Sequence, residues 1–304
     1  MPRHDRSTCP RCCVILRLVI AAVLLAGAAV GAARATVFTT DYDRLTVLPA
    51  LTGNGGDVDW RSKGAVTPVK NEGSCDASWA FAVTGLVEAS HVIRTGQLFA
   101  LSEQELLDCT GSQSGCSGGS PIAALRTVIA KGGLAKTSSY PYTARQGVCK
   151  AITPVATIPG AGRVPPGDEV SLQNYVARGA VLALVNASAA FDDYKGGVFT
   201  GPCTANDPTQ AVLIVGYTTG GGGYWIVKNS RGTSWGVQGY IYMARGTNLC
   251  GIADYAVAVS NDPLPSPVQP GAIATPTLTA VAMAMLLLGV AAFGFAALRG
   301  NAEH

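Results

Sequence analysis

The sequence predicts an α+β fold with two lobes, one helical and one built of strands, which face each other across a cleft. In the first half, apolar residues recur at helical spacing from Trp79 to Val92, as they do on a buried helix face. In the second half, short apolar runs alternate with turns such as the four glycines at 220–223, which is typical of a β-rich unit. The chain has 304 residues and is 48% hydrophobic, so a sizeable core is expected.

The N-terminus is predicted to be a secretory signal peptide over residues 1–35. Several arginines surround the start of an apolar run at 14–30, and Ala-Arg-Ala at 33–35 provides small residues for cleavage. The alternative is an uncleaved membrane anchor, which Arg17 within the apolar run disfavours. Residues 36–56 form a short segment that shows no helical periodicity and ends in Gly-Asn-Gly-Gly.

Two features predict helices in the first lobe. Gly73 and Ser74 form a tight loop before the apolar helical pattern, so we expect a helix to begin at Ser78. A nucleophile at that position is expected to be exposed in the cleft and to feel the positive end of the helix dipole. Ser102 with Glu105 three residues later matches a capping box, which predicts a second, short helix.

The second lobe is predicted to contain at least four strands. Its apolar runs cover residues 180–185, 211–217, 224–227 and 240–243. Each run has the length of a strand and is followed by turn residues, which indicates a sheet with a buried face.

Residues 71–82 read Asn-Glu-Gly-Ser-Cys-Asp-Ala-Ser-Trp-Ala-Phe-Ala, and they resemble the active-site loop of the papain-like cysteine peptidases, such as papain and cathepsins L and B. Residues 57–70, the Cys-Ser-Gly-Gly run at 116–119 and Tyr-Pro-Tyr at 140–142 extend the resemblance, which covers about 57–259. The resemblance implies a two-lobed papain-like fold, with a helical lobe and a β-barrel-like lobe, over residues 57–260. Zymogens of this family carry a long helical inhibitory propeptide, for which residues 36–56 are too short.

The resemblance also implies which residues occupy the catalytic positions, and three of the four have changed. Ser78 stands in the place of the nucleophilic cysteine, Gln210 in that of the histidine, and Glu72 in that of an oxyanion-hole glutamine, while the orienting Asn229 is retained. A glutamine amide does not titrate near neutral pH, so it cannot serve as general base. Glu72 would repel a developing oxyanion. Arg231 replaces the tryptophan that shields the asparagine. The expectation is a catalytically inactive homologue, a pseudopeptidase.

The resemblance also implies which residues would line a ligand-binding cleft. Gly118 and Gly119 would let a bound peptide approach the cleft wall, because glycine has no Cβ. The other implied lining residues are Ser120, Pro121, Thr209 and, at the base of the main specificity pocket, Tyr255. The sequence therefore predicts a cleft that binds a peptide or protein without cutting it, and Gly119→Trp is expected to block that cleft while folding stays intact. The alternatives are that these residues persist only for packing, or that Ser78 supports residual hydrolysis.

Six cysteines lie in the domain. Sequence alone allows fifteen pairings of six cysteines. The resemblance implies three pairs, which are Cys75–Cys116, Cys109–Cys149 and Cys203–Cys250. Disulfides agree with the oxidising route that a signal peptide opens.

The C-terminal region is predicted to anchor the protein in a membrane. A proline-rich spacer covers residues 261–277, an apolar run without charge covers 278–298, and 299–304 form a short tail that begins with Arg299. The run has the length of a membrane-spanning helix, and the arginine favours a cytoplasmic tail. A GPI signal is the alternative, although its tail would normally end hydrophobic.

The remaining expectations concern partners and modification. The formal net charge is +3, and acidic and basic residues nearly balance between Asp57 and Ser260, which gives no reason to expect a nucleic-acid partner. No cofactor is implied. Asn186 begins an Asn-Ala-Ser sequon and is expected to carry a glycan if its loop is exposed. The expected location is the secretory pathway, and cell surface and endosome or lysosome remain open.

Overall fold

The computed structural model describes residues 41–53, 55–111 and 115–261. The predicted signal peptide at 1–35, the membrane helix at 278–298 and the tail lie outside the described residues, and nearly all of the spacer does too. Within the described part of the chain, no helix combines the length and the apolar character needed to cross a membrane. The anchor therefore stays a prediction from sequence.

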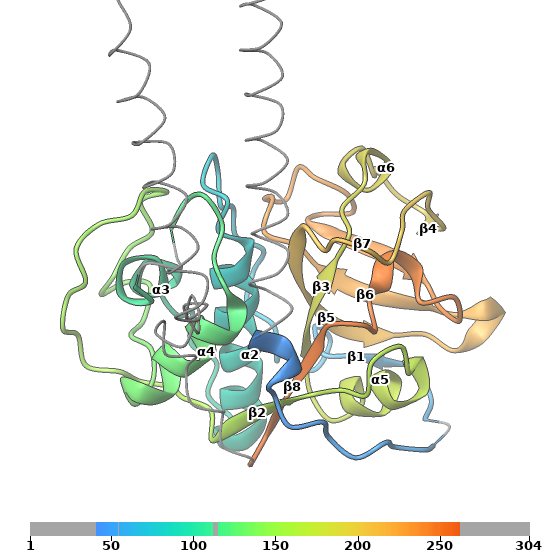
Figure 1. The fold of residues 1–304 in the computed structure, drawn as a ribbon, viewed down its shortest axis with the longest axis horizontal. Coiled ribbons are helices and arrows are strands. Elements are labelled where there is room, and N and C mark those ends of the chain that lie inside the picture. Colours follow the sequence, from blue (N-terminus) through green and yellow to red (C-terminus); the bar gives the residue numbers. More distant parts are fainter. Residues whose placement is uncertain (1–40, 54, 112–114, 262–304) are drawn as a thin grey trace, which may run out of the picture. The chain divides into compact units, whose positions relative to one another are not determined.

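Three helices build the first lobe, and the longest of them runs through its middle (Figure 1). They are α2 (Ser78–Thr95), α3 (Glu103–Cys109) and α4 (Pro121–Ala130). The central helix begins at Ser78, as predicted, and Gly96 ends it in the left-handed conformation (φ 75°), with its N–H donating to the Val92 carbonyl. Most of the first three turns are buried, so this helix is the core of its lobe.

The start of α3 shows half of the predicted capping box. Ser102 Oγ accepts a hydrogen bond from the N–H of Glu105 at 3.0 Å, as expected of an N-cap serine. The Glu105 carboxylate does not return to the cap but accepts from the N–H of Ala135 at 2.8 Å. Lys131 Nζ lies 3.4 Å from the same carboxylate. The Glu105 carboxylate therefore contacts residues distant in sequence instead of the backbone N–H of Ser102.

The second lobe is an eight-stranded sheet in the order β2-β8-β3-β5-β6-β7-β4, with β1 pairing on β5. Its strands are β1 (Val58–Asp59), β2 (Gly160–Arg163), β3 (Val181–Val185), β4 (Val198–Phe199), β5 (Gln210–Tyr217), β6 (Tyr224–Lys228), β7 (Tyr240–Ala244) and β8 (Ala256–Ser260). Strand β5 lies at the centre and is buried along its whole length. Its antiparallel register pairs Val185 with Gln210 at one end. The four predicted runs all become strands. Helices α5 (Glu169–Val176) and α6 (Ala189–Asp192) complete the lobe.

A glycine lets β1 approach the central strand. Gly216 lies opposite Asp59, and the pairing of β5 with β6 shifts register between Ile214 and Gly216. A Cβ at this glycine would lie 2.3 Å from the carbonyl oxygen of Val58. Any side chain here would therefore separate the two strands.

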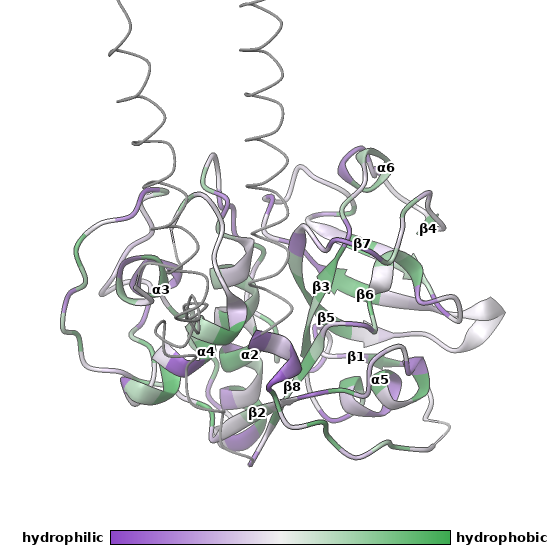
Figure 2. Cartoon of the chain, in the orientation of Figure 1, coloured by the Kyte–Doolittle hydropathy of each residue, from purple (hydrophilic) through white to green (hydrophobic). Residues whose placement is uncertain are grey.

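Hydrophobic side chains form two buried clusters, one on each side of the sheet. The first joins α2 and α4 to one face through residues such as Leu86, Leu125 and Leu213. The second packs α5 and the loops around Trp225 and Phe191. Figure 2 shows hydrophobic residues along the central strands, with hydrophilic residues mostly in the connecting loops. Apolar side chains of the first cluster thus pack the helical lobe against the sheet.

The structure contains the three disulfides that the resemblance implied. They join Cys75 to Cys116, Cys109 to Cys149 and Cys203 to Cys250. The sequence separations are 41, 40 and 47 residues, and bridges that close loops of this size stabilise a domain by about 2–4 kcal/mol each. Two of them staple the helical lobe and the third staples the β lobe.

Residues 41–48 pack into the domain, which the sequence interpretation did not anticipate. Tyr42, Leu45 and Leu48 are buried, and residues 41–43 form a short helical turn. We name residues 41–48 the N-terminal strap. Its buried apolar residues recur every three positions, a pattern too short to be recognised from the sequence.

Candidate functional site

Ser78 is the first residue of α2, but its hydroxyl is buried. The residue is 4% exposed, and its Oγ accepts a hydrogen bond from the N–H of Ala211 at 3.2 Å. The expectation that a side chain at this position would be exposed in the cleft is therefore wrong. The cause is the start of β5, whose backbone donor lies against the helix start and holds the hydroxyl inside.

Gln210 and Asn229 meet at the position where the resemblance implied a histidine and its orienting asparagine. Gln210 Nε2 donates to Asn229 Oδ1 at 3.0 Å, and both residues are buried. Arg231 Nη2 approaches Gln210 Oε1 at 3.4 Å from the other side. The side chain at position 210 is thus hydrogen-bonded to the asparagine as an oriented base would be, but it is an amide, which does not titrate near neutral pH.

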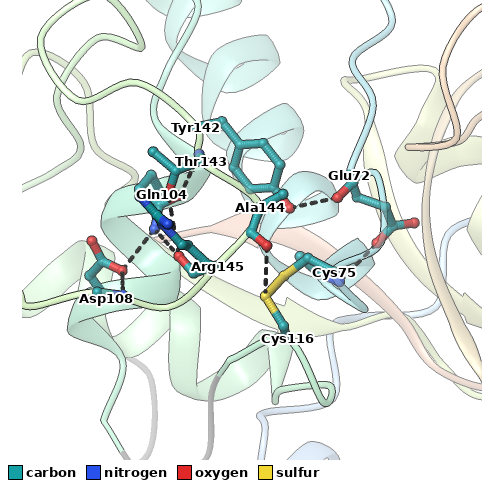
Figure 3. Close-up of a disulfide and its surroundings, with 11 residues drawn as sticks. Glu72, Cys75, Gln104, Asp108, Cys116, Tyr142, Thr143, Ala144 and Arg145 are labelled. Carbon is teal, nitrogen blue, oxygen red and sulfur yellow. Dashed lines mark hydrogen bonds between the residues drawn. A yellow bond between two sulfur atoms is a disulfide. The ribbon is translucent and has the colours of Figure 1, made fainter.

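The Glu72 carboxylate lies beside the start of α2, where it accepts two hydrogen bonds. Its Oε2 accepts from the N–H of Ala77 at 2.8 Å, and its Oε1 accepts from Ser230 Oγ at 2.8 Å. Burial raises the pKa of Glu72, and these two hydrogen bonds only partly counter that effect. Figure 3 shows Tyr142 donating to the Glu72 carbonyl, at 2.9 Å, beside the Cys75–Cys116 disulfide. The loop that carries the carboxylate is thus clamped in place.

Glu72→Gln is expected to stabilise the fold at neutral pH by about 1 kcal/mol, because it removes a buried charge, its amide oxygen can still accept from the N–H of Ala77, and its NH2 group can donate to Ser230 Oγ. Because the pKa of Glu72 is higher in the folded state than the unfolded value of about 4.3, the free energy of unfolding falls as pH rises above about 4.3. The gain should therefore be present at pH 7 and vanish below about pH 4. Urea denaturation at both pH values measures it, with the exposed Asp76→Asn as matched control. A variant less stable than wild type at pH 7 would contradict this account.

Sequence reasoning did not identify two polar neighbours of the site. Ser230 ties the two halves together, because its hydroxyl donates to Glu72 while its N–H donates to Asn229 Oδ1 at 2.9 Å. Asp192 pairs with Arg231 at 2.7 Å, and the Arg231 guanidinium lies 5.7 Å from the ring centre of Trp235. The arginine that replaces a tryptophan is thus held by an ion pair and an aromatic ring, and a cation sits at the edge of the site.

An open hollow of about 390 Å³ lies next to Glu72. Its lining is mostly polar. It comes from the loop before α2 and from Gln210 and Arg231, and consists of Asn71, Glu72, Gly73, Ser74, Cys75, Asp76, Gln210 and Arg231. Ser78 is not part of this lining, in agreement with its burial. The hollow is lined by two residues with carboxylates, two with side-chain amides and one with a guanidinium.

Gly119 is required for packing, which corrects an expectation from the sequence. A Cβ on this residue would lie 2.4 Å from Cε2 of Trp79, which is buried on α2. Gly119→Trp would displace that indole, so it cannot block the cleft while folding stays intact. Gly118 is half-buried with φ +96°, and a Cβ there would lie 3.5 Å from Asp76 Oδ2. Both glycines serve the local backbone whatever else they contact.

The other predicted ligand residues do not share one open surface. Ser120 is the N-cap of α4 and Pro121 its first residue, and both are buried. Tyr255 is half-buried, and its ring lies 5.1 Å from that of Tyr42 in the N-terminal strap. Thr209 is exposed beside Gln210, where its Oγ1 accepts from the N–H of Ala187 at 3.0 Å. Part of the predicted ligand site is thus covered by the chain itself.

The sequon side chains are engaged in the fold. Asn186 is half-buried, and its Nδ2 donates to the carbonyls of Asn206 and Asp207 at 2.8 and 3.0 Å. Ser188 Oγ donates to the carbonyl of Pro202 at 2.7 Å. A glycan on Asn186 would have to displace one of these contacts, and its presence stays a prediction.

Comparison with known proteins identifies relatives across the described domain. Residues 55–260 match the papain family of cysteine proteases. Cathepsin R of Mus musculus is 42% identical over 211 residues, which cover 66% of this chain and 63% of that protein. Caricain of Carica papaya is 48% identical over 185 residues, which cover 59% of this chain and 53% of that protein. The chain thus spans between about half and two thirds of the length of these curated relatives.

The fold is also found among solved structures. The bromelain protease of Ananas comosus, in complex with the inhibitor E64, is 41% identical with a TM-score of 0.66, and the match covers 69% of this chain and 100% of that one. A recombinant stem bromelain precursor is 39% identical with the same TM-score of 0.66, over 70% of this chain and 75% of that one.

The three disulfides and relatives such as cathepsin R indicate a secretory or lysosomal location. Because the match extends over residues 55–260, and thus over most of the chain, the chain belongs to the papain family of cysteine proteases.

Proposed function

We propose that this papain-family domain binds a peptide or protein segment without cleaving it. Gln210 carries the proposal, because it occupies the position of the general base and cannot take a proton. Its amide is already hydrogen-bonded to Asn229 at 3.0 Å, in the arrangement that would otherwise orient an imidazole. The relatives named above are described as proteases, so the proposed loss of activity rests on the substitutions at residues 72, 78 and 210 of this chain.

No other described group is suited to activate Ser78. The only histidine in the described residues is His91, which lies thirteen residues further along α2, about 20 Å away at 1.5 Å per residue. Glu72 already accepts hydrogen bonds from Ala77 and Ser230. The N–H of Ala211 donates a hydrogen bond to the Ser78 hydroxyl and takes no proton from it. The second candidate function, residual hydrolysis by Ser78, therefore lacks a base.

Glu72, at the position of the oxyanion-hole glutamine, also supports a non-catalytic function. Acyl transfer needs donors aimed at the developing oxyanion. Glu72 presents acceptors instead, and one of them occupies the N–H of Ala77. The same carboxylate faces the polar hollow, where it favours cationic or hydrogen-bond-donating groups on a ligand.

We also propose that the domain is held at a membrane by residues 278–298, with the domain outside the cytosol. This part rests on the sequence pattern of a signal peptide, a proline-rich spacer and an apolar run. Detection of the domain on intact cells by surface labelling, with loss of membrane association when 278–298 is deleted, tests it.

The purified protein is expected to cleave no peptide in a broad substrate library above the rate of Ser78→Ala. Thiol-directed active-site reagents should leave residues 57–260 unlabelled, because the six cysteines there are paired. Ser74→Ala, a change of an exposed serine in the same loop, is the matched control. Cleavage that Ser78→Ala abolishes and Ser74→Ala retains would establish the hydrolase instead.

A further inference from the structure

The N-terminal strap crosses from α4 to the edge of the sheet, and its contacts have the form of ligand recognition. Figure 1 shows it as the blue segment in front of α2 and α4 that continues past β8 and β2. Its partners come from three elements that are far apart in sequence: the start of α4, strand β8 and edge strand β2.

An aromatic side chain of the strap fills an internal pocket. Tyr42 is 1% exposed and meets the ring of Tyr255 edge to face, with centroids 5.1 Å apart. Its hydroxyl donates to the carbonyl of Ala256 on β8 at 3.1 Å. Burial raises the pKa of Tyr42, so the phenol keeps the proton that it donates. The pocket is therefore matched to a tyrosine rather than to a phenylalanine.

The preceding residue supplies a charge to the same site. Asp41 Oδ1 pairs with Arg126 on α4 at 3.2 Å, and the two side chains are only 8% and 14% exposed. Asp41 Oδ2 accepts from Ser120 Oγ at 3.5 Å. Asp43 provides the contrast, because its side chain is 64% exposed where it pairs with Arg163. The site thus distinguishes an acidic residue at position 41 from one at position 43.

The rest of the strap adds to the sheet edge. Strand β2 ends the strand order, so one side of it is open for pairing. Thr46 accepts from the N–H of Arg163 at 3.0 Å, and Leu48 donates to the Arg163 carbonyl at 2.8 Å. Extended segments that pair with a sheet edge while selected side chains enter pockets form a common mode of peptide recognition. Leu45 and Leu48 supply further buried anchors.

We propose that α4, β2 and β8 form a binding site for a segment with an acidic residue followed by tyrosine and then leucines three and six residues on, and that the strap occupies this site in cis. A partner peptide with that pattern binds by displacing the strap, whose Asp43, Arg44, Thr46 and Val47 face solvent. The proposal rests on the proposed function in taking the domain as a binding protein. It adds the class of ligand and the competitor.

The test measures binding of a fluorescent peptide with the sequence of residues 39–49 to the full chain. Wild type should bind it weakly, and the double variant Asp41→Asn with Tyr42→Ala should bind it at least 10-fold more tightly. Asp43→Asn is the matched control and should bind like wild type. In the peptide itself, Tyr42→Phe and Asp41→Asn should each weaken binding to the double variant several-fold. Trypsin cleavage after Arg44 should be faster in the double variant than in wild type or the control.

Equal affinity in wild type and the double variant, with equal cleavage after Arg44, would overturn the proposal. A double variant that loses its cooperative unfolding transition and does not regain it with added peptide would also overturn it, because the strap would then be a fixed part of the core. Mass spectrometry of the peptide after incubation separates the two proposals. Cleaved peptide would contradict the non-catalytic function. The measured affinities alone decide whether the strap occupies a peptide-binding site.

Discussion

Ser78→Cys combined with Gln210→His and Glu72→Gln is expected to raise kcat/KM for peptides at least about 1,000-fold above Ser78→Cys alone. A positioned general base contributes about 100- to 10,000-fold, and an oxyanion donor about 100- to 1,000-fold. The structure prepares the first contribution, because Asn229 Oδ1 already accepts a hydrogen bond from the side chain at position 210. The start of α2 would favour the thiolate at position 78.

Three controls make this result specific. Ser78→Ala with Gln210→His and Glu72→Gln should be inactive, since it has a base and an oxyanion donor but no nucleophile. Ser78→Cys alone should stay at background, because Gln210 provides no base. Adding Arg231→Trp should raise activity further, since the guanidinium 3.4 Å from Gln210 Oε1 would oppose an imidazolium there. Robust turnover by Ser78→Cys alone would refute the proposal that Gln210 prevents catalysis by providing no base.

Lys70→Met is expected to destabilise the domain by about 3–5 kcal/mol at pH 7, because it removes the cation that is hydrogen-bonded to two buried carboxylates. Lys70 Nζ donates to Glu88 and Glu103 at 2.9 and 2.5 Å, and both carboxylates are 2% exposed. Burial by itself would lower the pKa of Lys70, but the two carboxylates raise it overall. Burial raises the pKa of Glu103 even with the lysine present. Removing the lysine would raise that pKa further.

The pH dependence of this loss follows from the raised carboxyl pKa. When the pKa of a glutamate is higher in the folded than in the unfolded state, the free energy of unfolding falls as pH rises above the unfolded value of about 4.3. The destabilisation caused by Lys70→Met should therefore shrink below that pH. Guanidinium denaturation at pH 7 and pH 4 measures it. Lys63→Met, a change of an exposed lysine whose Nζ lies 4.4 Å from the ring centre of Trp60, is the control and should cost at most about 1 kcal/mol. Adding Glu103→Gln to Lys70→Met should recover part of the loss. A loss no larger than that of Lys63→Met would contradict the account.

Much of the domain could be predicted because its signals are local or contiguous. Helical spacing predicted that α2 begins at Ser78, and apolar runs predicted β3, β5, β6 and β7. The resemblance in the motif residues implied the three disulfides and the meeting of Gln210 with Asn229. The expectation that Gln210 cannot serve as a base also follows from the residue type, since an amide does not titrate near neutral pH.

Tertiary contacts decided what the local pattern could not express. Ser78 is buried because Ala211, 133 residues away, donates to its hydroxyl, and Glu105 leaves its capping box because Ala135 offers a donor. Gly119 is glycine because Trp79 occupies the space of a side chain. The strap looked like a linker, yet Tyr42 reaches β8 across 214 positions of sequence. The sequence by itself determined the family, the start of α2, four of the strands and the residue types at the positions where the resemblance places the catalytic groups. Only the tertiary structure decided burial and partners, because these depend on residues that packing alone brings together.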